Sequence, residues 1–243
     1  MIGRVVLAVI LAGIAAGFIM GAIQHVRLTP LILAAEAFER VDHTHDHSAT
    51  QPEGATDAEG STAAHDHDHG AGWAPENGWQ RTLATTVTAV MAGAGFAAVL
   101  AGISLVTGLP ITRQNGIVWG LCGFIAVTLA PSAGLPPELP GMTAAELWPR
   151  QIWWVGTIAA TSAGIYLIAT RRELWALIFA ALLVLVPHVI GAPAAAHEPA
   201  SVPPGLVATF VANAIAANAI FWICIGLFLG LVLDRTAKDI YAT

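Results

Sequence analysis

The sequence predicts an all-α, polytopic membrane helix bundle with about six transmembrane helices and one long His-rich loop. Hydrophobic residues make up 56% of the 243 residues and charged residues only 11%, a composition typical of a protein that crosses a membrane several times. Apolar stretches recur at about the 20-residue length that spans a bilayer. A single long polar stretch, residues 41–72, interrupts them. We therefore expect one membrane domain over residues 1–243, with a flexible His/Asp-rich loop at 41–72 between the first two helices.

Six apolar segments are the predicted spans. The first begins almost at Met1 and is too long for the apolar region of a signal peptide, so we expect an uncleaved helix. The fifth is short and ends in Pro187-His188. Two Pro-rich stretches, 135–141 and 192–204, are expected to connect helices. The six segments lie at residues 4–26, 82–109, 116–134, 151–169, 174–190 and 206–233.

The distribution of lysine and arginine predicts the orientation of the chain. Cytoplasmic loops carry an excess of these residues, and the larger group falls on the side of both termini. We therefore expect both termini in the cytoplasm and the His-rich loop outside. The inner group is Arg4, Arg113, Arg171, Arg172, Arg235 and Lys238, and the outer group is Arg27, Arg40, Arg81 and Arg150.

Small residues recur at four-residue spacing in four of the spans. Such faces let helices approach closely in a membrane, where no hydrophobic drive brings them together. We interpret them as packing faces of a tight bundle and not as sites of chemistry. They are Gly13, Gly17 and Gly21, then Ala89, Gly93, Ala97 and Ala101, then Gly156, Ala160 and Gly164, then Gly226 and Gly230.

Two histidine clusters, separated by a Ser/Thr/Gly/Glu spacer, mark the polar stretch. Imidazole is a common ligand of transition metals, and alternating histidines bring several rings within reach of one ion. The residues cannot form a buried core, so we expect a mobile loop that captures metal. The alternative is a solvated acidic loop with incidental histidines. The clusters hold six of the nine histidines: His43, His45 and His47, then His65, His67 and His69.

Few polar side chains fall within or beside the apolar segments. His25 and His188 are predicted near the outer face at similar depth, with Asn213 slightly deeper and Glu36 following the first span. Neutral imidazole and amide ligands favour a transition metal over Mg²⁺ or Ca²⁺. We therefore predict His25, Glu36, His188 and Asn213 as metal ligands. Interfacial hydrogen bonding is the alternative for each histidine, and interhelical hydrogen bonding for Asn213 and Asn218.

Several function classes are excluded or disfavoured. The sole lysine, Lys238, has no Walker A context, and neither HExxH nor GxSxG occurs. No basic patch supports nucleic-acid binding. An intramembrane metalloenzyme is disfavoured because no acidic general base lies within a span. We expect no enzymatic activity and no tightly bound cofactor.

Four sequence segments resemble the CbtA family of predicted cobalt transporter subunits. They are QHVRLTPLILAAEAFE (24–39), WGLCGFIAVTLAPSAGLPPELPG (119–141), RQIWW (150–154) and LVPHVIGAP (185–193). The resemblance implies a bacterial inner-membrane protein tied to cobalamin synthesis, with a small one-helix, His-containing partner, CbtB. It covers His25, Glu36, Glu138 and His188. The family is often described as having five helices, whereas six apolar segments are present here.

Together these features predict a transition-metal uptake subunit. Its expected substrate is Co²⁺, with Ni²⁺ or Zn²⁺ as alternatives, because affinity orders alone do not select cobalt. The second hypothesis is a membrane metal sensor or assembly subunit that binds metal without transporting it.

Overall fold

The computed structural model describes residues 2–46, 75–195 and 202–241, and within these ranges the chain forms helices and connecting turns without strands. The first rod comprises α1 (Ile2–Ile23), the π-helix η1 (Gln24–Leu28) and α2 (Thr29–Asp46). A second broken helix comprises α4 (Gly116–Phe124), the π-helix η2 (Ile125–Leu129) and α5 (Ala130–Ser132). The remaining helices are α3 (Trp79–Thr107), α6 (Leu147–Thr170), α7 (Leu174–Ile190) and α8 (Pro204–Tyr241).

The predicted membrane helix bundle is confirmed, with spans of two kinds. Four helices are long and apolar enough to cross a membrane: Gly3–Phe38, Trp79–Thr107, Leu147–Thr170 and Pro204–Asp234. The other two apolar helices, Gly116–Ser132 and Leu174–Ile190, are shorter. A 17-residue helix rises about 25 Å, somewhat less than the roughly 30 Å hydrocarbon core. The part of the chain that the structure describes therefore has six apolar helical segments, two of which are shorter than a full span.

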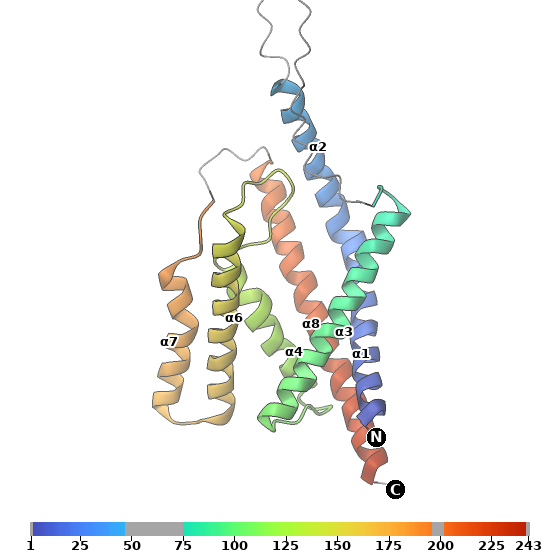
Figure 1. The fold of residues 1–243 in the computed structure, drawn as a ribbon, viewed down its shortest axis with the longest axis vertical. Coiled ribbons are helices and arrows are strands. Elements are labelled where there is room, and N and C mark those ends of the chain that lie inside the picture. The colour runs from blue at the N-terminus through green and yellow to red at the C-terminus, as the bar shows by residue number, and fades with distance from the viewer. Residues whose placement is uncertain (1, 47–74, 196–201, 242–243) are drawn as a thin grey trace, which may run out of the picture.

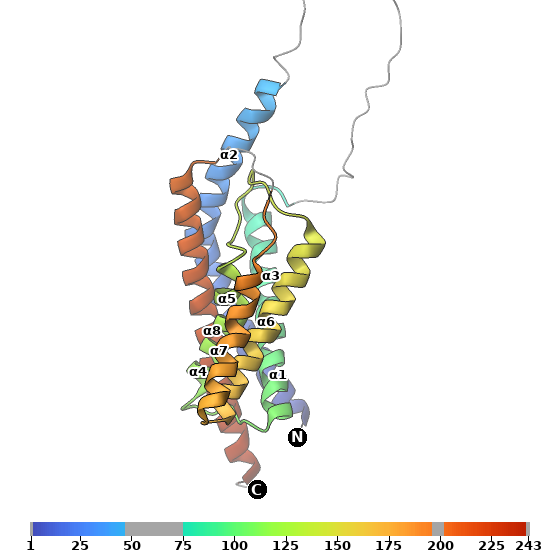
Figure 2. The same cartoon turned by 90° about the vertical axis from the view of Figure 1, so that its left-hand side faces the viewer.

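The helices run alternately up and down, and the two labelled termini lie at the same end of the bundle (Figure 1). At the opposite end α2 projects beyond the other helices (Figure 2). Helix α2 continues to Asp46, so residues 41–46, which we predicted as the start of the loop, are helical.

Glycine contacts hold the centre of the bundle together. A side chain at Gly13 would overlap the backbone of Gly93 on α3, and one at Gly116 would overlap the Gly226 carbonyl on α8. Helix α1 also packs along α8, which joins the two pairs. We call α1, α3, α4 and α8 the glycine core. The small faces of the first, second and sixth predicted spans are thus confirmed as packing faces.

Helices α6 and α7 form a hairpin beside this core (Figure 1). Helix α7 packs chiefly on α6, and α6 reaches the rest of the bundle mainly through η2 and α5. The two hairpin helices approach closely at Gly164, which faces Ala180, whereas Gly156 has open space beside it. The predicted packing face of this span is therefore only partly used.

Each π-helix precedes a proline at the same spacing. Pro30 lies two residues after η1 and Pro131 two residues after η2. A proline inside a helix lacks the N–H donor and collides with the carbonyl four residues earlier. The local widening to a π-helix accommodates that collision, and such bulges are frequent at functional sites.

Candidate metal-handling site

His25 lies in η1 and faces α3. Its Nδ1 is 3.2 Å from Thr82 Oγ1, and the ring is exposed. The neighbouring Gln24 has a buried Oε1 without a hydrogen-bond partner. An exposed imidazole with one hydrogen-bonded nitrogen leaves the other nitrogen for a ligand, so the geometry at His25 is compatible with metal coordination.

Glu36 forms an ion pair across the α2–α3 interface. Arg81 Nη2 donates to Glu36 Oε1 at 2.6 Å, and Arg81 Nη1 donates to Asn77 Oδ1 at 2.8 Å. Both charged side chains are partly exposed, at 24% for Arg81 and 22% for Glu36. A cation that reached Glu36 would therefore compete with a guanidinium that already neutralises the carboxylate.

Both ring nitrogens of His188 lie against backbone carbonyls. Nδ1 is 2.8 Å from the Val184 carbonyl oxygen, and Nε2 is 2.9 Å from the Ala130 carbonyl oxygen. A neutral imidazole donates from one nitrogen and only the doubly protonated ring donates from both. Coordination by either nitrogen would therefore displace one of these contacts.

Asn213 and Asn218 each donate to their own helix, at 2.8 Å to the Thr209 carbonyl and 3.0 Å to the Ala214 carbonyl. Glu138, which the family resemblance also covers, accepts a hydrogen bond from Arg150 Nη2 at 2.9 Å. The two ion-paired carboxylates, Glu36 and Glu138, are both partly buried.

The structure does not gather the predicted ligands into one coordination shell. Helix η1 packs on α1, α2 and α8, whereas α7 packs on α6, so His25 and His188 belong to different parts of the bundle. Among the described residues no group of three or more His, Cys, Asp or Glu side chains could hold a metal ion. His47, His65, His67 and His69 lie outside the described residues. His43 and His45 fall within the range of α2, where the description covers the backbone alone.

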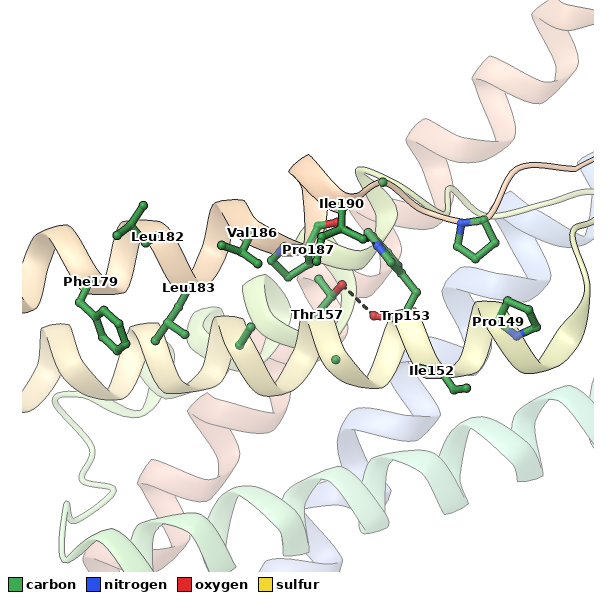
Figure 3. Close-up of a pocket in the computed structure, with 14 residues that line it drawn as sticks. Pro149, Ile152, Trp153, Thr157, Phe179, Leu182, Leu183, Val186, Pro187 and Ile190 are labelled. Atoms are coloured by element: carbon green, nitrogen blue, oxygen red, sulfur yellow. Dashed lines mark hydrogen bonds between the residues drawn. The ribbon is translucent and has the colours of Figure 1, made fainter.

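An apolar groove of about 900 Å³ lies between α6 and α7 (Figure 3). Trp153 and Pro187 line it, and Trp153 Nε1 donates to the Pro187 carbonyl at 3.0 Å. Thr157 also lines the groove, but its hydroxyl donates to the Trp153 carbonyl at 2.8 Å. A groove without free polar groups offers nothing to a cation, so we do not place the ion there.

Sequence reasoning missed the partners of the predicted residues. Among the described residues, four with a charged or imidazole side chain each contact a side chain that we did not pair with them from the sequence. These partners are Arg81 for Glu36, Thr82 for His25, Arg150 for Glu138 and Trp153 for His188. A signal was available in part, because Arg81 and Arg150 each stand at the start of an apolar segment where a nearby carboxylate is a natural partner.

Together the long apolar helices, the two short helices and the non-helical chain beyond them are features of a polytopic membrane transport protein. Comparison with family models then gives the particular family. Residues 2–234 match the family described as probable cobalt transporter subunit (CbtA), and the chain belongs to that family. No curated protein and no solved structure matches the chain.

Proposed function

We propose that this chain is the membrane-spanning subunit through which Co²⁺ enters a bacterial cell. The observation that supports this proposal best is the pair of short helices, α4–η2–α5 and α7, set among full-length spans. The backbone is non-helical over residues 133–146 and 191–195, and Leu139 in the first of these stretches is only 3% exposed. In transporters, broken helices and buried irregular backbone occur where they line a route for the substrate.

In this proposal both termini are cytoplasmic and the chain lies in the inner membrane. The shared end of the two termini in Figure 1 agrees with an even number of crossings. The segment 41–72 is then external, and its six histidines collect the ion. Protons compete with metal for imidazole near the ordinary histidine pKa of about 6.5, so collection weakens below that pH.

His25 and Glu36 receive the ion at the outer end of the glycine core. Binding there replaces the Arg81 guanidinium as the counter-charge of Glu36, with His25 supplying a nitrogen ligand and Asn213 an amide oxygen further along. The inward movement of a divalent cation gains about 4.6 kcal/mol per 100 mV of inside-negative potential. We expect the small His-containing subunit CbtB to complete the transporter, since a subunit implies a larger assembly.

Flux into proteoliposomes tests this proposal. The purified chain, alone and with CbtB, is reconstituted around a metal-sensitive dye, and Co²⁺, Ni²⁺ and Zn²⁺ are added outside at inside-negative potential. We expect saturable Co²⁺ entry, reduced at least tenfold in His25→Ala. Deletion of residues 42–69 is expected to weaken the apparent affinity while leaving the maximal rate nearly unchanged, as for a collecting segment.

The absence of a three-ligand cluster among the described residues favours a second function, a membrane metal sensor or assembly subunit. Such a protein would bind Co²⁺ through the histidine clusters without transporting it. The same assay discriminates: metal binding with no flux, even in the presence of CbtB, supports the second function. Neither function requires catalysis, and we propose that the chain is not an enzyme.

A further inference from the structure

The ends of two short helices meet at His188. Helix α5 ends at Ser132 and α7 ends at Ile190, and the His188 ring lies between the Ala130 and Val184 carbonyls. The Trp153 ring meets it edge to face, with centroids 5.8 Å apart and planes at 82°. One imidazole thus contacts α5, α6 and α7 at the same level.

Pro187 weakens the last turn of α7, so contacts with other helices matter for holding this turn in place. Because proline has no N–H, the Leu183 carbonyl loses its usual helical partner and the last turn of α7 is weakened. Two donors converge instead on the Pro187 carbonyl, Trp153 Nε1 at 3.0 Å and Gly191 N at 3.1 Å. The Gly191 bond is the last i→i−4 bond of α7, so the end of α7 is held by one further hydrogen bond, from Trp153 on α6.

The attachment of the hairpin to the rest of the bundle is narrow. Helix α7 packs chiefly on α6, and α6 meets the bundle mainly at η2 and α5. The bond from His188 to Ala130 spans 58 residues of sequence, and it ties α7 directly to α5. By contrast, α1–α3 and α4–α8 are joined along their lengths by backbone contacts at glycine.

We propose that His188 is a positioning residue that fastens the α6–α7 hairpin to α5 and does not bind the transported ion. Its Nε2–H donates to the Ala130 carbonyl, and the hairpin swings relative to the glycine core when that bond opens. The role of this swing in transport rests on the proposed function, whereas the bond itself does not. We call this His188–Ala130 hydrogen bond the latch. Metal coordination through Nε2 would break it, so this nitrogen cannot serve both as the donor of the latch and as a metal ligand.

Three substitutions of His188 distinguish a hydrogen-bonding role from a metal-binding role. Gln places an amide N–H near the position of Nε2, Asn reaches only the position of Nδ1, and Ala has neither. An amide is a poor substitute for imidazole at a transition metal, so His188→Gln keeps the latch donor and loses the ligand. Backbone hydrogen exchange in lipid nanodiscs, without metal, reads the latch independently of transport.

We expect His188→Ala and His188→Asn to raise exchange about tenfold at residues 130–135 and 186–195, with no change at 86–97. That factor corresponds to about 1.4 kcal/mol, the size of one net hydrogen bond. His188→Gln should keep wild-type exchange and Co²⁺ uptake within about twofold of wild type. His188→Asn is the fallback if the alanine variant does not accumulate.

Two outcomes overturn the proposal. Wild-type exchange in His188→Ala or His188→Asn would show that the bond fastens nothing. Loss of uptake in His188→Gln as complete as in His188→Ala, with exchange preserved, would show that His188 is a ligand. A wild-type chain without flux would count against the proposed function alone, because the exchange data still decide the latch.

Discussion

The glycine core and the α6–α7 hairpin are built from similar apolar helices but are fastened in different ways. In the core, Gly17 lies against the α3 backbone and Gly120 against the α8 backbone, so helices touch along extended faces. The hairpin meets its neighbours mainly where α6 packs on η2 and α5 and where His188 is hydrogen-bonded to the Ala130 carbonyl, whereas Trp153 bonds α6 to α7 within the hairpin. Extended close packing resists motion, whereas a small junction with one hydrogen bond between α7 and α5 can open and reform. From this difference we infer that the glycine core is the fixed part of the molecule and that the hairpin is the part that moves.

The largest expected effect is in the core. Gly93→Ala places a methyl group against the Gly13 carbonyl, and backbone cannot yield as a side chain can. We expect a loss of more than about 3 kcal/mol, beyond ordinary overpacking of 1–3 kcal/mol, measured by unfolding in detergent. Gly95→Ala on the same helix has no atom within 4 Å and is the matched control. Equal stability of the two variants would refute the rigid-core account.

A smaller effect is expected within the hairpin, where Trp153 holds the end of α7 to α6. Trp153→Phe keeps an aromatic ring beside His188 but removes the donor to the Pro187 carbonyl. We expect a loss of about 1 kcal/mol, seen as faster exchange at residues 186–195. Faster exchange throughout α1 and α3 as well would mean that hairpin and core unfold as one unit.

The two ion pairs allow a comparison of metal affinity. Arg81→Gln removes the ion-pair partner that Glu36 has on α3, and Arg150→Gln removes the ion-pair partner that Glu138 has on α6. Exposed pairs contribute at most about 1 kcal/mol, so we expect Arg81→Gln to tighten Co²⁺ binding about threefold in calorimetry. Arg150→Gln should leave it unchanged. Tighter binding in Arg150→Gln alone would move the entry site to the hairpin side.

The smallest effect is expected at Gly156. This glycine lines the α6–α7 groove (Figure 3) and has nothing within 4 Å of an added methyl group. Gly156→Ala should change stability by less than about 0.5 kcal/mol, as at surface positions. A loss as large as that of Gly93→Ala would indicate that another helix occupies the groove.

The sequence was sufficient for the helices and for most of their packing faces. Apolar length predicted six segments, and the spacing of Gly13, Gly17 and Gly226 predicted close contacts that the structure contains. Apolar length did not predict the π-helices, although the prolines at 30 and 131 follow them at a constant distance. The collision of a proline with the preceding turn can be relieved by a kink or a bulge, and surrounding packing selects between them.

The candidate site was harder to predict than the fold. The pairing of Glu36 with Arg81 and of His188 with Ala130 joins residues 45 and 58 positions apart, which depends on how the helices are arranged in space. A polar residue in an apolar segment signals a partner but does not identify it. The ligand prediction for His188 therefore overlooked carbonyls, which carry no sequence signature. The His188→Gln variant tests that prediction.

The most direct test of the fixed core and movable hairpin is hydrogen exchange of the wild-type chain with and without Co²⁺. The account predicts that saturating Co²⁺ changes exchange at residues 130–146 and 186–195, where the hairpin joins the bundle, and leaves residues 10–20 and 86–97 unchanged. A change confined to the α1–α3 interface, with the hairpin junction unaffected by Co²⁺, would contradict it.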